Sequence, residues 1–473
     1  MAAKSSNAFL WKSAGAIANQ GIAFCFTILL ARKLMPADFG FVAAAMSVIH
    51  IAKIFINIGL SEALIQNKET NQITFSSVFV LNAIIGAILF IIIFCSAPLL
   101  ADFLEDKRLT NIVRIISTIV LFDSLTVVQR ALLSKGLEFD KLVKTSLITQ
   151  SFSGLLAIGF LYLGYEIYAL VVQNISISFI SAILLWRISD WRPNIVFNKA
   201  EVMKLYEYTK YSFLTLLTNN GFKNVVPIII AKSFSANTLG FYRRADSLVK
   251  MVINIINDSV RQVLFAQLSR MQEDSKASSR VFEISLELVV VLAAFFSAQV
   301  YLCSELFFLE ILGDQWAESL PIFRILIFLG LLEPFQLVIN SATLSKGLSK
   351  MNYYAQTSRR VFDLTSLAIG LIFGFFPFLY AIIVSSLVGA LVYIRIGDRV
   401  FLNSVRRVLK RAIIPVGVII CLVYSLETRL ELDNLWALTT SKVLIMTSAF
   451  GVFFFFFRKK FILSLIQIIT HKN

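Results

Sequence analysis

Apolar residues fall in long runs that short polar segments separate along the whole chain. A helix needs about 20 consecutive apolar residues to cross a bilayer, and these runs have that length. The first run continues to Leu30, which favours a retained helix over a cleaved signal peptide. The pattern predicts an all-α polytopic membrane protein with about fourteen transmembrane helices. The predicted spans are 10–30, 41–65, 75–96, 112–133, 147–163, 167–186, 211–231, 239–268, 282–303, 322–344, 361–375, 379–396, 413–426 and 436–457.

Composition supports the same class. Of the 473 residues, 58% are hydrophobic and only 15% are charged, whereas a soluble domain carries about 25% charged residues. The four cysteines stand singly in apolar runs, without metal-ligand spacing, and no nucleotide-binding motif is present. These observations predict no metal, no cofactor and no enzyme. The net charge of +15 is spread over loops between spans, which argues against a nucleic-acid partner.

Lysine and arginine are concentrated in the even-numbered connections and after the last span. Because basic loops stay in the cytoplasm, this asymmetry predicts cytoplasmic N- and C-termini and an even number of spans.

Short segments recur in the same order in two parts of the chain, and they predict a duplication of six spans. The halves should be related by a pseudo-two-fold axis along the membrane normal, with a site between them. The expected divisions are an N-lobe (1–190), a linker (191–205), a C-lobe (206–397) and a basic linker with two last spans (398–473). The matching pairs are Asn19–Gly21 with Asn219–Gly221, Ala31–Phe41 with Ala231–Phe241, and the pentapeptide LSKGL at Leu133–Leu137 and Leu344–Leu348.

LSKGL is interpreted as the cytoplasmic end of the fourth helix in each repeat. Lys135 and Lys346 would anchor that end, and Gly136 and Gly347 would stop the helix.

Basic and amide residues occur inside spans one, two, seven and eight, the equivalent pairs of the two repeats. Charges in spans are costly and usually face the interior or water. The set predicts a water-filled cavity that attracts a phosphate and offers hydrogen bonds to sugars. The alternative is that single members snorkel to the interface or form structural ion pairs. The predicted cavity residues are Lys12, Asn19, Lys53, Asn57, Asn219, Lys223, Arg243, Arg244, Lys250 and Asn254.

Two carboxylates inside spans are candidates for coupling transport to an ion. Asp123 lies seven residues before Arg130, so both would share one helical face. Glu333 shares a face with Gln336 and Asn340 in the same way. The alternative is a satisfied interior hydrogen bond, and no motif identifies the ion.

Three segments carry a family resemblance: "ARKLMPADFGFVAAAMSVI", "QRALLSKGLEFDKL" and "LGFYRRADSLVKM". Together they resemble polysaccharide flippases of the multidrug/oligosaccharidyl-lipid/polysaccharide exporter superfamily, in the branch of colanic-acid and teichuronic-acid exporters. The resemblance covers about residues 8 to 400 and rests on the order and spacing of short motifs.

The resemblance implies two six-helix lobes in a V shape in a bacterial inner membrane. It implies that an undecaprenyl-diphosphate-linked oligosaccharide moves from the cytoplasmic to the periplasmic leaflet by alternating access. Membrane lipid is an expected partner, and polysaccharide polymerase and chain-length proteins are candidate ones. Basic residues of spans one, two, seven and eight would meet the diphosphate. By their position within the spans, Lys53 and Lys223 are the best individual candidates, since they sit deepest.

Other functions remain open at this point. A related multidrug or cation antiporter should have an acidic or apolar cavity, and a peptidoglycan-precursor flippase would be an essential gene product. A membrane glycan polymerase or ligase needs a sizeable external loop, and the longest here is short. A structural scaffold leaves the repeat and the charged spans unexplained.

Overall fold

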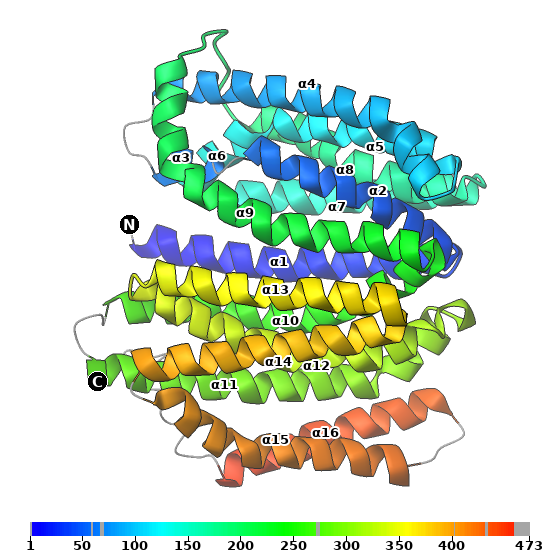
Figure 1. The fold of residues 1–473 in the computed structure, drawn as a ribbon, viewed down its shortest axis with the longest axis vertical. Helices are drawn as coiled ribbons and strands as arrows, with labels where there is room; N and C mark the ends of the chain where they lie inside the picture. The colour runs from blue at the N-terminus through cyan, green and yellow to red at the C-terminus, as the bar shows by residue number, and fades with distance from the viewer. Residues whose placement is uncertain are drawn as a thin grey trace. The chain divides into compact units, whose positions relative to one another are not determined.

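The structure is a computed structural model that describes residues 2–57, 60–66, 71–270, 275–401, 403–430 and 434–457. Within these ranges every regular element is a helix, and long helices run side by side (Figure 1). The α-helices are α1 (Ala2–Ala31), α2 (Pro36–Asn57), α3 (Leu60–Gln66), α4 (Gln72–Phe103), α5 (Arg108–Ser124), α6 (Val127–Lys135), α7 (Phe139–Tyr162), α8 (Glu166–Ile188), α9 (Lys199–Ser233), α10 (Ala236–Arg270), α11 (Ser275–Leu302), α12 (Ser319–Ser345), α13 (Ser349–Phe373), α14 (Phe375–Val400), α15 (Ser404–Arg429) and α16 (Leu435–Phe457). A π-helical turn (Leu306–Ile311) and a 3₁₀ turn (Asp314–Trp316) lie between α11 and α12.

Each predicted span overlaps a helix or a pair of helices, so the all-α membrane class is confirmed. Ten of the described helices are long and apolar enough to cross a membrane, or eleven if the bent pair α5 and α6 is one span. The three other predicted spans correspond to α9, α10 and α13, which carry charged residues within the helix. The count of fourteen stays a prediction.

The chain divides into two compact units, Met1–Gly240 and Phe241–Asn473. In the first unit, α2 packs on α4, α5, α8 and α9, and α7 packs on α1 and α8. Its core contains Ile49 of α2 and Ile116 and Val120 of α5, all fully buried. The first unit includes α9, whereas the predicted N-lobe ends at residue 190; those lobe limits stay a prediction.

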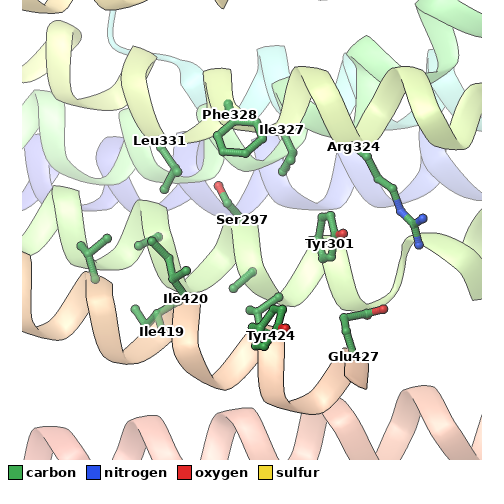
Figure 2. Close-up of a pocket in the computed structure, with 14 residues that line it drawn as sticks. Ser297, Tyr301, Arg324, Ile327, Phe328, Leu331, Ile419, Ile420, Tyr424 and Glu427 are labelled. Carbon is green, nitrogen blue, oxygen red and sulfur yellow. The ribbon is translucent and has the colours of Figure 1, made fainter. Parts of the chain in front are cut away.

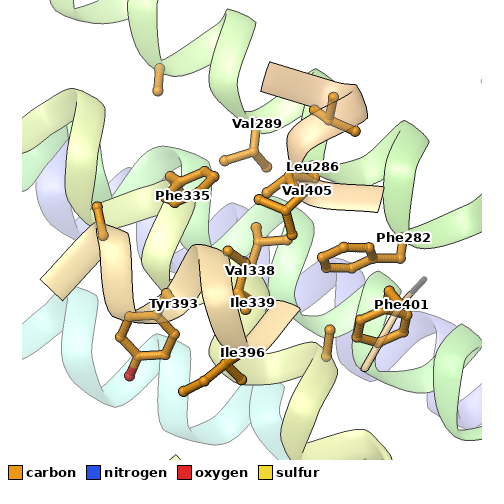
Figure 3. Close-up of a cluster of buried hydrophobic side chains, with 14 of the residues drawn as sticks. Phe282, Leu286, Val289, Phe335, Val338, Ile339, Tyr393, Ile396, Phe401 and Val405 are labelled. Carbon is orange, nitrogen blue, oxygen red and sulfur yellow. The ribbon is translucent and has the colours of Figure 1, made fainter. Parts of the chain in front are cut away.

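The second unit has its core between α11, α12, α14 and the start of α15 (Figure 3). The rings of Phe282 and Phe401 stack there with centroids 4.1 Å apart, and Val405 lies in the same cluster. Lipid is as apolar as these side chains, so close packing and interhelical polar contacts hold membrane helices together. The helices therefore position polar groups by tight packing on their neighbours.

The two copies of LSKGL both end helices, but one residue out of step. In the second copy, Gly347 has φ +75° and takes the left-handed position that glycine favours. In the first copy, Gly136 has φ −74° and Leu137 takes the left-handed position instead, with φ +57°. Helix α6 does end at Lys135 with Gly136 as its C-cap, but the left-handed residue is Leu137, because α6 ends one residue later relative to the motif.

Helices α2 and α10 begin with a reciprocal close contact at two glycines, within the first unit. A Cβ on Gly40 would lie 1.8 Å from the carbonyl oxygen of Ala236, and one on Gly240 would lie 2.0 Å from that of Pro36. Pro36 and Ala236 are the first residues of their helices, and each glycine is four residues further on. Gly40 and Gly240, and likewise Pro36 and Ala236, are 200 residues apart, which is the offset between the matching segments Ala31–Phe41 and Ala231–Phe241.

Candidate functional site

In the first unit, Lys53 of α2 forms an ion pair with Asp123 of α5. The Lys53 Nζ lies 2.6 Å from the Asp123 Oδ2, and the side chains are 32% and 23% exposed. The packing of α2 on α5 brings them together although they are 70 residues apart. Each charge neutralises the other, which offsets the free-energy cost of placing a charged side chain between membrane helices. Lys53 and Asp123, predicted separately as a phosphate ligand and an ion-coupling group, are therefore direct partners.

The predicted common face of Asp123 and Arg130 is wrong in one respect, because the helix is not continuous. Residues 125 and 126 separate α5 from α6, and the two helices are bent by 40°. Arg130 instead donates a hydrogen bond to the Ser181 Oγ of α8, at 2.6 Å.

The other candidates of the first unit differ in their surroundings. Asn19 of α1 is half-buried, and its buried Oδ1 has no hydrogen-bond partner among the described residues. Lys223 of α9 is exposed. The helices that carry Lys12, Asn57 and Asn219 are described, but these three side chains lie outside the described part of the structure.

A loop contact also joins two helices of the first unit. Lys232, at the end of α9, donates a hydrogen bond of 2.7 Å to the Glu105 Oε1 in the loop between α4 and α5. This bond and the lysine charge lower the pKa of the Glu105 carboxyl below its ordinary value. Glu105 is therefore anionic at neutral pH.

In the second unit, α10 carries four of the predicted cavity residues, Arg243, Arg244, Lys250 and Asn254. Lys250 forms an ion pair with Asp246, one helical turn away, and Asn254 is exposed. Arg243 is half-buried. Arg244 is buried, and its guanidinium lies 5.0 Å from the centre of the Trp316 ring, in cation–π geometry.

A second interhelical ion pair joins α12 and α13. One terminal nitrogen of Arg359 lies 2.7 Å from the Glu333 Oε1, and the other donates to the Gln336 Oε1 at 3.0 Å. The shared face predicted for Glu333, Gln336 and Asn340 is confirmed, because this face meets α13 and Asn352 donates to the Asn340 Oδ1 at 2.9 Å. Glu333 thus has a basic partner, as Asp123 does.

Sequence reasoning missed Arg359. The predicted span began at Val361, which placed Arg359 in a loop, whereas α13 begins at Ser349. At 1.5 Å per residue, Arg359 lies about 15 Å along the helix. The available signal was Asp363, four residues later on the same face, a spacing typical of a continuing helix.

A cavity of about 400 Å³ lies between α11, α12 and α15 in the second unit (Figure 2). Arg324, Tyr301 and Glu427 stand at one end of it, and apolar side chains such as Leu331 and Ile420 line the other. Arg324 is ion-paired with Glu305. Such a lining suits a hydrocarbon chain and does not suit a diphosphate.

These arrangements define what the two units can do chemically. Each holds a base and a carboxylate from neighbouring helices, so an incoming anion could exchange for the carboxylate at the base. A cation at Asp123 or Glu333 would have to displace Lys53 or Arg359. Among the described residues, no group of three or more His, Cys, Asp or Glu side chains could hold a metal ion.

Some known proteins resemble this chain in sequence and others in fold. The chain is 24% identical over 309 residues to the teichuronic acid biosynthesis protein TuaB of Bacillus subtilis, covering 64% of this chain and 63% of the relative. It is 26% identical over 310 residues to the succinoglycan biosynthesis transport protein ExoT of Rhizobium meliloti, covering 65% and 62%. The matched part is thus under two thirds of either relative's length.

Among solved structures, the lipid II flippase MurJ in an inward closed conformation has a TM-score of 0.74. It covers 94% of this chain and 98% of its own, at 15% identity, and so shows a shared fold. The family profile described as "Polysaccharide biosynthesis protein" matches residues 29–321, which is more than half of the chain. The protein is therefore a member of the polysaccharide biosynthesis protein family, and a multi-pass membrane protein.

Proposed function

We propose that this protein moves a polyprenyl-diphosphate-linked oligosaccharide from the cytoplasmic to the periplasmic leaflet of a bacterial inner membrane, for surface-polysaccharide biosynthesis. The observation that carries the proposal is a set of bases held inside the helices of a polysaccharide biosynthesis protein. Lys53 on α2 and Arg359 on α13 are both paired to a neighbouring helix and both partly exposed. Bases in such positions can meet an anion inside the bilayer.

Moving such a molecule across a bilayer is a physical problem that this arrangement can solve. A glycan and a diphosphate are too polar to cross hydrocarbon, whereas the polyprenyl chain dissolves in it. A protected path with basic and amide groups would carry the head group, and the chain would stay in apolar surroundings. The apolar cavity of the second unit supports a place for such a chain. Alternating access and cytoplasmic termini belong to the same proposal.

The base at Lys53 would act by exchange of partners. In the structure, Asp123 neutralises Lys53. When the diphosphate arrives, it would replace Asp123, so the lysine would never stand uncompensated. Other candidate ligands would add hydrogen bonds to the head group: Asn19, Asn57, Asn219, Lys223, Arg243, Lys250 and Asn254. Two further residues, Lys12 and Arg244, would add positive charge.

Lipid analysis of a deletion strain tests the activity and the substrate class together. We expect one polyprenyl-linked repeat unit to accumulate on the cytoplasmic side. Accumulation of a peptidoglycan precursor would instead identify the rival flippase. Drug hypersensitivity without any accumulated lipid would favour the multidrug or cation antiporter.

Variants of the Lys53 pair separate a substrate contact from a structural bridge. We expect Lys53→Ala and Lys223→Ala each to reduce glycan export while the protein stays in the membrane. The exchanged pair Lys53→Asp with Asp123→Lys keeps the bridge but moves the base to α5. If the exchanged pair exported glycan as well as the wild type, the bridge would be structural and Lys53 would not be a ligand.

A further inference from the structure

The loop between α8 and α9, residues 189–198, is tied to the start of α4. Two side chains of α4 hold its backbone: Asn194 N donates to the Ser76 Oγ at 3.0 Å, and Asn198 N to the Ser77 Oγ at 2.9 Å. Gln72 adds two bonds, accepting from the Trp191 Nε1 at 2.6 Å and donating to the Arg192 carbonyl at 2.7 Å. This segment, called the linker loop below, therefore has a fixed position.

The tip of the linker loop is apolar and projects away from the protein. It consists of Ile195, Val196 and Phe197, which are 99%, 46% and 50% exposed. The Val196 N donates to the Asn194 carbonyl at 2.8 Å, which closes a three-residue turn at the tip. Because Asn194 and Asn198 are hydrogen-bonded to α4, the backbone of the tip is held on both sides.

The surroundings place this tip beside lipid. Helix α4 has the highest mean hydropathy of the candidate spans, 3.0, and exposes Ile84, Ile88 and Ile91 along one side. A helix of that kind faces hydrocarbon. The linker loop begins directly after α8, another candidate span, and Figure 1 shows it as an open loop beside the first turns of α4. It thus lies at the depth where helices leave the bilayer.

Basic residues flank the apolar tip in the sequence; one of them, Arg192, also donates to the Ser189 carbonyl at 2.6 Å. Arg187, Arg192 and Lys199 are exposed on either side of it. The nearest acidic side chains in sequence are Asp190 and Glu201, and Glu201 accepts a hydrogen bond from the Thr74 hydroxyl. An apolar tip flanked by bases is the composition of an interfacial anchor on anionic lipid.

We propose that Ile195, Val196 and Phe197 insert into the membrane leaflet at this end of the helices, with the flanking bases on its phosphate groups. The proposed binding partner of the exposed tip is thus the lipid surface. In the proposed orientation this is the cytoplasmic leaflet. The anchor would hold the linker between the repeats, and through it the start of α9, at a fixed depth. The depth of the tip in the membrane can be measured whichever substrate the protein carries.

Spin labels measure the depth directly. Single cysteines at 195, 197 and 199 are introduced in the full chain after its four native cysteines are replaced, and nitroxides are attached. The protein is reconstituted in nanodiscs of zwitterionic phospholipid with and without anionic phospholipid. We expect labels at 195 and 197 to be reached by oxygen in preference to a water-soluble nickel chelate, and the label at 199 to show the reverse. Anionic lipid should move the labels at 195 and 197 deeper into the bilayer.

Two outcomes would overturn the proposal. Equal access of the chelate to positions 195, 197 and 199 would place the tip in water. Protection from both reagents in native membranes, with full chelate access in nanodiscs of the purified protein, would identify a protein partner. As a control for fixation, Ser76→Ala with Ser77→Ala should increase the mobility of the label at 195, and Ser96→Ala, elsewhere on α4, should not.

Discussion

At the scale of single residues, Arg359 binds two acceptors of α12 at once. Its planar guanidinium places one nitrogen on Glu333 and another on Gln336. A lysine offers one point charge and cannot reproduce this fork. We expect Arg359→Ala to lower the free energy of unfolding by about 2–4 kcal/mol, because the partly buried Glu333 carboxylate would lose its ion pair with α13. Arg359→Lys should recover part of the loss.

A double-mutant cycle with Glu333→Gln checks this prediction. Thermal unfolding in detergent is measured for both single variants and the double variant. Because the residues touch, the double variant should lose less stability than the sum of the single losses. Strict additivity would contradict the pair, and Ser358→Ala, beside Arg359, serves as the control.

The contact between Glu105 and Lys232 gives a pH-dependent prediction. The pKa of Glu105 is lowered in the folded protein from its ordinary value of 4.5. Its contribution is therefore present above about pH 4.5 and is lost as the pH falls through the lowered folded pKa. In melting curves, Glu105→Gln should be less stable than the wild type at neutral pH and equal to it in strong acid. A difference that is the same at every pH would refute the charge contribution.

The sequence could predict which residues lie on polar faces, but not their partners. Periodicity placed Glu333, Gln336 and Asn340 on one face correctly. It could not find Arg359 opposite them, because that contact depends on how α13 packs on α12. In the same way, Lys53 and Asp123 were identified separately and paired only by the packing of α2 on α5. Helix existence follows from local composition, whereas contacts between helices do not.

At the scale of elements, the ends of α6 and α12 test the cost of a left-handed residue. Leu137 has φ +57° and is exposed, so its side chain contributes little packing. Glycine accepts this conformation without the steric cost that other residues have, about 1–2 kcal/mol. We expect Leu137→Gly to raise stability by about 1 kcal/mol, measured by thermal unfolding.

The second copy of the motif supplies the matched control. Leu348 occupies the same place in LSKGL but has φ −85°, so Leu348→Gly should be neutral or destabilising. Gly347→Ala should destabilise, because Gly347 holds the left-handed position there. Equal effects of glycine at 137 and 348 would show that the one-residue difference between the copies has no energetic weight.

The break between α5 and α6 was the element that the apolar pattern could not show. Residues 112–133 are predicted as one span, yet the helix bends by 40° at residues 125 and 126. No proline or glycine marks the place. The Trp186 Nε1 of α8 donates to the Leu125 carbonyl at 3.0 Å, so a tertiary contact takes up a backbone group that the break leaves open.

At the scale of the whole molecule, the predicted repeat can be tested with substitutions at four glycines. A Cβ at Gly40 or Gly240 would collide with a backbone carbonyl, whereas Gly21 and Gly221 have nothing within 4 Å. We expect Gly40→Ala and Gly240→Ala to destabilise the protein and reduce glycan export. Gly21→Ala and Gly221→Ala, in helix interiors, should be neutral or stabilise by about 0.5–1 kcal/mol. Loss of export in the second pair alone would contradict the assigned contact.

The reciprocal contact of Gly40 and Gly240 has a consequence for the origin of the chain. Residue 40 meets residue 236, and residue 240 meets residue 36, which is the pattern of an isologous interface between identical subunits. If the chain arose by the predicted duplication, a single gene product would have made this contact with a second copy of itself. The two sides differ in sequence, because proline stands at position 36 and alanine at the equivalent position 236. The predicted duplication would thus trace the two glycines to one position of an ancestral homodimer.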